Sequence, residues 1–239
     1  MISAEGALGR GLRVVLLDGL GTLLSLAPPA AELARGLRER YGLRLEAGDA
    51  ERALAAEIDY YRAHHHEGRD ESTLAELRGR CAAVLRAALP EAVAAALDEA
   101  QLRGAMLDAL RFFAYPEVPA TLGALRRRGL ELVVVSNWDV SLPAVLADLG
   151  LRELLDGVVT SAEVGRPKPD PAIFRAALRL AGASPAQALH VGDSPELDLA
   201  GARAAGISAV LLDRSGSHRA LGPEAPGVPV IASLADLLA

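Results

Sequence analysis

The chain has 239 residues and a formal net charge of -6 at pH 7. This acidic balance excludes a polybasic nucleic-acid surface, and a single cysteine, Cys81, excludes an internal disulfide. Aromatic residues make up only 3% of the sequence, so Leu, Val and Ala must fill the core.

The N-terminal sequence favours a cytoplasmic location. Residues 1–11 lack a basic stretch followed by an apolar one, so no signal peptide is expected. The apolar run at 14–26 is interrupted by Asp18 and two glycines, and it is too short to span a bilayer. We expect no membrane or nucleic-acid partner, and either a monomer or a homodimer.

The first predicted element is a strand at 14–17, a short apolar run that ends at Asp18 and Gly19. Its continuous apolar character is typical of a strand covered on both faces of a parallel sheet. The sequence then becomes helical as far as residue 113. The pattern predicts helices at 29–41, 47–65, 71–88 and 91–113.

After Tyr115 and Pro116 the pattern changes to alternating strands and helices. Strands are predicted at 130–135, 157–160, 188–191 and 208–212. Helices are predicted at 118–128, 142–149, 171–181 and 195–205. Such alternation indicates an α/β fold, with a parallel sheet and helices on both of its faces. The stretch 222–229, rich in proline and glycine, predicts a loop before a last short strand.

Four polar features follow the predicted strands. The first is Asp18-Gly19-Leu20-Gly21-Thr22, where a carboxylate precedes glycines that let the backbone approach a ligand. A dinucleotide fingerprint is excluded, because Leu24 occupies the third glycine position and no helix opens there. The second is Ser136-Asn137, whose donors suit an anion, although helix capping explains this pair better when it is taken alone.

The third feature is Lys168, the only lysine in the chain, which is placed between Pro167 and Pro169. An ammonium group with a restricted backbone suits a phosphate or carboxylate. Asp170 and Pro171 read as the N-cap and first residue of the next helix. The fourth feature contains Asp193 and Asp198, which with Asp18 form an oxygen-rich set suited to Mg²⁺.

These four stretches, in this order, resemble the haloacid dehalogenase superfamily of hydrolases. The resemblance covers roughly residues 12–26 and 114–239 and implies a Rossmann-like core made of residues 1–26 and 114–239. Residues 27–113 resemble the superfamily's all-helical cap domain by position and pattern alone.

The resemblance implies a Mg²⁺-dependent phosphatase that acts on a small phosphorylated metabolite. Asp18 would be the nucleophile and form an aspartyl phosphate. Mg²⁺ would bind Asp18, the backbone carbonyl of Leu20 and Asp193, and Asp198 would support these ligands. The groups assigned to the phosphate and its surroundings are Thr22, which orients the site behind Asp18, and Ser136, Asn137 and the catalytic Lys168.

The first motif departs from the family's phosphatases at Leu20, where they usually carry a second Asp for general acid–base catalysis. Leucine cannot transfer a proton, so three interpretations stay open. The favoured one is a phosphatase for good leaving groups, or one with an acid supplied elsewhere, for which His64, His65 and His66 are candidates. The next is a phosphometabolite- or partner-binding protein with little turnover. A 2-haloacid dehalogenase ranks third, because those enzymes lack the counterpart of Asp193.

Overall fold

The protein is described by a computed structural model that covers residue 9, residues 11–216 and residues 228–239. It divides into two compact units, one made of Met1–Ser25 and Ala114–Ala239 and the other of Leu26–Phe113. Two earlier predictions fall largely outside the described residues. They are the lack of a signal peptide at residues 1–11 and the loop at 222–229.

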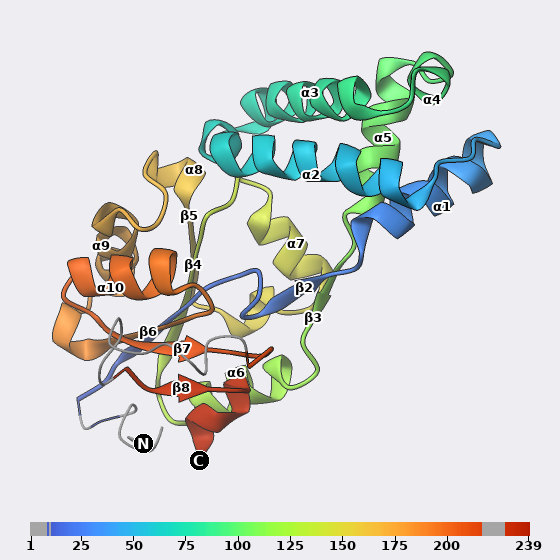
Figure 1. The fold of residues 1–239 in the computed structure, drawn as a ribbon. Helices are drawn as coiled ribbons and strands as arrows, with labels where there is room; N and C mark the ends of the chain where they lie inside the picture. The colour runs from blue at the N-terminus through green and yellow to red at the C-terminus, as the bar shows by residue number, and fades with distance from the viewer. Residues whose placement is uncertain (1–8, 10, 217–227) are drawn as a thin grey trace. The chain divides into compact units, whose positions relative to one another are not determined.

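The first unit contains a six-stranded sheet in the order β5-β4-β1-β6-β7-β8, in which every pairing is parallel (Figure 1). Its strands are β1 (Val14–Leu17), β4 (Glu131–Ser136), β5 (Gly157–Thr160), β6 (Ala188–Gly192), β7 (Ser208–Leu212) and β8 (Val230–Ile231). Leu17 of β1 pairs with Val134 of β4 and Val191 of β6, so these three strands end at one edge. The predicted α/β fold with a parallel sheet is confirmed.

Helices cover both faces of this sheet, because the central strand β1 is apolar and buried on both sides. The helices are α6 (Val118–Arg127), α7 (Leu142–Asp148), α8 (Ser161–Val164), α9 (Pro171–Leu180) and α10 (Ala200–Ala204). Phe174 of α9 and Ala202 of α10 pack against Val14 and Leu16 on one face. Val15 and Leu17, which alternate with them, are also fully buried and point to the opposite face.

Two local elements of the first unit differ from the sequence-based expectation. The predicted helix at 195–205 is a single π-helical turn, Pro195–Leu199, followed by α10. The short helix α8 was not predicted, although Thr160 and Glu163 form a capping box at its start. Short 3-10 turns complete the unit at Arg152–Leu154, Pro185–Gln187 and Leu234–Leu238.

The second unit is helical and has its own core. Its helices are α1 (Pro29–Tyr41), α2 (Ala47–His64), α3 (Glu71–Ala88), α4 (Glu91–Ala95) and α5 (Glu99–Ala109), with a 3-10 turn at His65–Glu67. All five helices contribute to one buried cluster, which includes Leu37, Leu54, Leu77, Val93 and Leu102. In the described part of the chain, none of the helices has the length and apolar character needed to cross a membrane.

The prediction of one helix at 91–113 is wrong. The structure has α4, then α5, then the strand β3 (Phe112–Ala114). Asp98 divides the two helices, because its carboxylate accepts from the Gln101 backbone N–H at 2.8 Å while the Gln101 side chain accepts from the Asp98 N–H at 2.9 Å. This capping box starts a new helix, and the Asp-x-x-Gln spacing was its sequence signal.

The chain passes between the two units twice. The strands β2 (Leu24–Leu26) and β3 form a two-stranded sheet at these passages. Tyr115 N donates to Leu23 O at 3.1 Å in the first unit, and Ala27 N donates to Arg111 O at 2.9 Å in the second. Each unit therefore joins its own two ends by a backbone hydrogen bond.

The helical unit buries one carboxyl group. Glu57 of α2 is only 3% exposed, and its carboxylate accepts a hydrogen bond from the Cys81 thiol of α3. Burial raises the pKa of Glu57 above its ordinary value of 4.5, and the thiol offsets this only in part. The native state therefore binds this proton more tightly than the unfolded chain does.

Glu57→Gln tests the cost of this buried group. A carboxyl with a raised pKa contributes stability below its unfolded pKa, and that contribution is lost as pH rises through its folded pKa. We therefore expect Glu57→Gln to raise the free energy of unfolding at about pH 8 and to lose this advantage towards about pH 4. Urea denaturation measures it, with the exposed Glu76→Gln as the control. A gain that is equal at both pH values would contradict the assignment.

Candidate active site

Asp18 follows β1 at the carboxyl edge of the sheet, with its side chain 8% exposed. Lys168 Nζ lies 2.5 Å from Asp18 Oδ1, and Ser136 Oγ donates to the same oxygen at 3.2 Å. These three residues come from three separate stretches of the chain. The structure thus brings the predicted nucleophile, the predicted lysine and the predicted serine together.

The backbone of Lys168 is held by Asn137. Lys168 N donates to Asn137 Oδ1 at 2.7 Å, and Asn137 Nδ2 donates to Lys168 O at 3.1 Å. Asn137 therefore contacts Lys168 and is not the cap of the next helix, which was the alternative explanation of this feature. The N-cap of α7 is Ser141, and its backbone N–H donates to Asp139 Oδ1 at 2.7 Å. Asp170 does cap α9, as predicted.

Asp198 neutralises the other side of the lysine. Its Oδ1 lies 2.6 Å from Lys168 Nζ and 2.9 Å from His190 Nε2, while its Oδ2 accepts from Ser194 N at 3.0 Å. Three donors on one carboxylate suit a supporting role, because little of Oδ1 is left for a ligand.

His190 is a site residue that the sequence analysis did not single out. It lies on β6, is fully buried and packs edge-on against Phe174, with 4.9 Å between ring centroids. Its Nε2 contacts the same Asp198 oxygen as Lys168 Nζ does, and so it helps to fix that carboxylate. The available signal was a histidine inside an apolar strand, three residues before Asp193.

Asp193 lies directly after β6, close to the turn that follows Asp18. A Cβ placed on Gly21 would lie 2.1 Å from Asp193 Oδ2, and Gly21 has a φ of +87°. Only glycine meets both requirements at this position. Likewise, a Cβ on Gly192 would lie 2.2 Å from Asp198 Cγ.

The carboxylates of Asp18, Asp193 and Asp198 form one acidic cluster. Each offers an oxygen that lies within 4.8 Å of the other two. Burial raises the pKa of Asp18 to about 6, and the nearby charges of Asp198 and Asp193 add to this, against the lowering effect of Lys168. For Lys168, burial alone would lower the pKa, but Asp18 and Asp198 outweigh it and raise the pKa.

Two predicted residues of the first motif, Thr22 and Leu20, do not contribute a side-chain hydrogen bond to the site. The Thr22 hydroxyl is fully buried and makes no hydrogen bond with any described residue, so the structure does not join it to Asp18. Leu20 lies in the turn after Asp18, and its side chain is 39% exposed. The position at which the family's phosphatases carry a second Asp therefore presents an apolar side chain to solvent.

The histidines considered as alternative acids lie where α2 ends and a 3-10 turn begins. His64 Nδ1 contacts Tyr60 O at 2.7 Å, and its ring stacks on the Tyr60 ring at 4.0 Å between centroids. His65 is buried within the helical unit. His64 and His65 therefore make these contacts within the helical unit.

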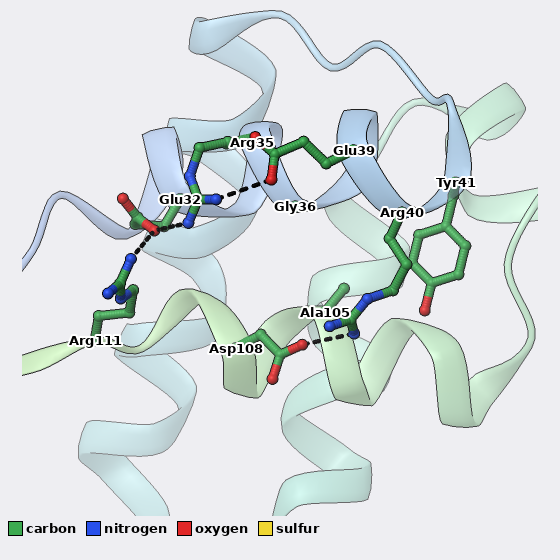
Figure 2. A pocket seen from close by; sticks show the side chains of 9 residues that line it. All are labelled: Glu32, Arg35, Gly36, Glu39, Arg40, Tyr41, Ala105, Asp108 and Arg111. Atoms are coloured by element: carbon green, nitrogen blue, oxygen red, sulfur yellow. Dashed lines mark hydrogen bonds and ion pairs between the residues drawn. The ribbon is translucent and has the colours of Figure 1, made fainter.

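A separate pocket of about 550 Å³ lies between α1 and α5 of the helical unit (Figure 2). Six charged side chains line it, and each has an opposite partner within the pocket. The pairs are Arg35 with Glu32 and Glu39, Arg111 with Glu32, and Arg40 with Asp108. Since these charges neutralise one another, we assign no chemistry to this pocket.

Comparison with known proteins points to one family. A family model described as haloacid dehalogenase-like hydrolase matches residues 12–206. Haloacid dehalogenase-like hydrolase domain-containing protein 3 of Homo sapiens is 34% identical over 95% of this chain and 92% of its own length. The Bos taurus protein of the same name is 52% identical, over 39% of this chain and only 37% of its own length. A phosphoserine phosphatase of Thermus thermophilus is 41% identical over 60% of this chain and 56% of its own length.

Solved structures share the architecture. A HAD phosphatase of Thermococcus onnurineus has a TM-score of 0.63 and 25% identity, over 95% of this chain and 96% of that one. A 2-haloacid dehalogenase of Pseudomonas syringae has a TM-score of 0.65 and 24% identity over the same shares. Because two chemistries occur on this fold, the fold alone does not decide between them.

Lys168→Met tests the buried charge network. The substitution leaves two buried carboxylates without their common cation, and breaking a buried pair in this way typically costs about 3–5 kcal/mol. We expect a loss of that order in the free energy of unfolding, measured by urea denaturation. Arg13→Met is the control, because its pair with Glu131 is 49% and 41% exposed and should contribute below about 1 kcal/mol. Equal losses in the two variants would contradict this account.

Proposed function

Since the chain belongs to the haloacid dehalogenase-like hydrolase family, we propose that it is a Mg²⁺-dependent phosphatase of small phosphorylated metabolites. The observation that carries the proposal is the convergence of Asp18 with Lys168 and the acidic cluster at the carboxyl edge of the sheet. Open α/β sheets bind their ligands at this edge. The similarity to a phosphoserine phosphatase supports a phosphoryl substrate without identifying which one.

The acidic cluster fits a hard divalent cation. Each of its carboxylates offers an oxygen that lies within 4.8 Å of the others, and the lack of a side chain on Gly21 lets the Asp193 carboxylate lie against the turn after Asp18. Asp18, Asp193 and the backbone carbonyl of Leu20 would hold Mg²⁺, and Asp198 would support them. Bound there, the ion would offset the negative charge of the phosphoryl group.

The chemistry would proceed in two displacements. An Asp18 carboxylate oxygen forms a bond to phosphorus while the bond from phosphorus to the leaving oxygen breaks, and the electron pair departs with that oxygen. Water then attacks the aspartyl phosphate, which releases inorganic phosphate and restores Asp18. Lys168, Ser136 and Asn137 would hold the phosphoryl oxygens.

Leu20 limits the substrates that this site can process. No proton reaches the leaving oxygen from position 20, so the leaving group must be stable as an anion or receive its proton elsewhere. Because Leu20 cannot donate a proton, a second candidate function stays open, that of a phosphometabolite-binding protein with little turnover. Metal-independent dehalogenation is less favoured, because it gives no role to Asp193 in the acidic cluster. The cytoplasmic location, and a monomer or homodimer, stay predictions.

Phosphate release from p-nitrophenyl phosphate and acetyl phosphate, with Mg²⁺ or with EDTA, tests the proposal. Both substrates have leaving groups that need little protonation. We expect Mg²⁺-dependent turnover that falls below about 1% of wild type in Asp18→Asn, because the nucleophile is lost. Asp148→Asn, an exposed aspartate of α7, is the matched control and should retain full activity.

Two results would contradict the proposal. The absence of turnover in folded, Mg²⁺-loaded protein would favour the binding protein, which equilibrium binding of phosphometabolites would then examine. Halide release from a 2-haloacid in the presence of EDTA would instead favour the dehalogenase.

Leu20→Asp tests the missing acid directly. The exposed position tolerates a carboxylate, and general acid–base help is typically worth about 10²–10⁴-fold. We expect kcat/KM for an alkyl phosphate, whose leaving group needs a proton, to rise by about 10²-fold, with a much smaller rise for acetyl phosphate. Leu20→Asn, which has the same shape but no acid, should leave both values low. An equal rise of kcat/KM in Leu20→Asp and Leu20→Asn would contradict this account, because it would show that the size of the Leu20 side chain, and not the missing proton donor, limits turnover in the wild type.

A further inference from the structure

Arg214 follows β7, and its side chain reaches the turn after Asp18. Its Nε donates to the Gly21 carbonyl at 3.1 Å, and its Nη2 donates to the Thr22 carbonyl at 2.8 Å. The side chain is 18% exposed. Two parallel bonds of this kind use the planar fork of a guanidinium group, which an ammonium group does not reproduce.

The rest of the guanidinium is also engaged. Its Nη1 lies 2.6 Å from Glu117 Oε1, and its Cζ lies 3.6 Å from the centroid of the Tyr115 ring. Tyr115 N in turn donates to Leu23 O at 3.1 Å, so this residue contacts both the arginine and the turn. A solvated surface arginine has no such set of partners. Arg214 is instead fixed by an ion pair, an aromatic face and two backbone acceptors.

The hydrogen bonds inside the turn engage the Gly19 carbonyl, which accepts from the backbone N–H groups of Leu23 and Leu24 at 2.8 and 2.9 Å, and the Gly21 N–H, which donates to Leu24 O at 2.7 Å. None of these bonds uses the carbonyls of Gly21 and Thr22. The hydroxyl of Thr22 makes no hydrogen bond within the described part of the chain. The carbonyls of Gly21 and Thr22 are therefore anchored from outside the turn, by Arg214.

We propose that Arg214 is a positioning residue for the turn that follows the nucleophile. It acts through the Gly21 and Thr22 carbonyls, and so it fixes Leu20, whose own carbonyl would hold the metal. A small displacement of such a turn is costly, because catalysis needs its groups held to well within about 1 Å. The catalytic consequence rests on the proposed function, whereas the effect on the turn does not.

Hydrogen exchange measured by mass spectrometry, together with kinetics, tests this proposal in the full-length protein. In Arg214→Met we expect the peptide that contains Leu23 and Leu24 to exchange about tenfold faster, as loss of anchoring hydrogen bonds predicts. The kcat for acetyl phosphate should fall on the order of 10²-fold, with a much smaller change in KM, because positioning and not binding is lost. Direct titration with Mn²⁺, followed by its electron paramagnetic resonance signal, should show weaker metal binding.

Matched variants separate positioning from general stability. Arg126→Met is the control for the loss of a guanidinium. Arg126 also has an acidic partner, Asp156 at 3.0 Å, and a backbone acceptor, Leu154 O at 3.2 Å, but it contacts none of the partners of Arg214. This variant should change neither exchange at the turn nor kcat. Arg214→Lys keeps the charge beside Glu117 without the fork, so it should show intermediate values, and it replaces the Met variant if that variant does not fold.

The outcomes distinguish this proposal from the proposed function. Unchanged exchange at the turn in both Arg214 variants would overturn the proposal, whatever the activity. Faster exchange with wild-type kcat would overturn the positioning role. If the wild type hydrolyses neither substrate, the proposed function fails, while exchange and Mn²⁺ binding still decide whether Arg214 fixes the turn and its metal site.

Discussion

A single buried ammonium group allows the acidic residues of this protein to lie together. Two carboxylates about 4 Å apart repel each other by roughly 4 kcal/mol at an effective dielectric constant of 20. Lys168 Nζ lies between Asp18 and Asp198, within hydrogen-bonding distance of both, and offsets this repulsion. Asn137 fixes the backbone of Lys168, and His190 fixes Asp198. The position of Asp18 therefore depends on contacts between four separate stretches of the chain.

Much of the fold could be predicted, because it follows from local periodicity. Apolar runs bounded by glycine and polar residues identified β1, β5 and β7, and amphipathic spacing identified α1 and α3 to the residue. The errors occurred where a few side-chain bonds decide the outcome. The capping box at Asp98 divided one predicted helix, and strands of three residues, such as β2, carry too short a pattern to recognise.

The site was predictable only in part, for a related reason. Residues that directly follow strands, such as Asp18 and Asp193, share an edge of a parallel sheet, and this could be expected from the order of elements. The pairings of Asn137 with Lys168 and of Arg214 with Gly21 join residues 31 and 193 positions apart, and no spacing reports them. His190 looked like an ordinary strand residue, because its partner Asp198 lies in a π-helical turn that the sequence pattern did not show.

The backbone bonds that close each unit have an evolutionary consequence. Leu23 and Tyr115 bring together the two ends of the sheet unit where the chain leaves and returns, and Ala27 and Arg111 do the same for the helical unit. A segment with adjacent ends can be lengthened, shortened or replaced without altering the register of the parallel strands. The architecture is therefore modular. An exchange of the helical unit would therefore leave in place the paired strands β1, β4 and β6 and the residues that directly follow them.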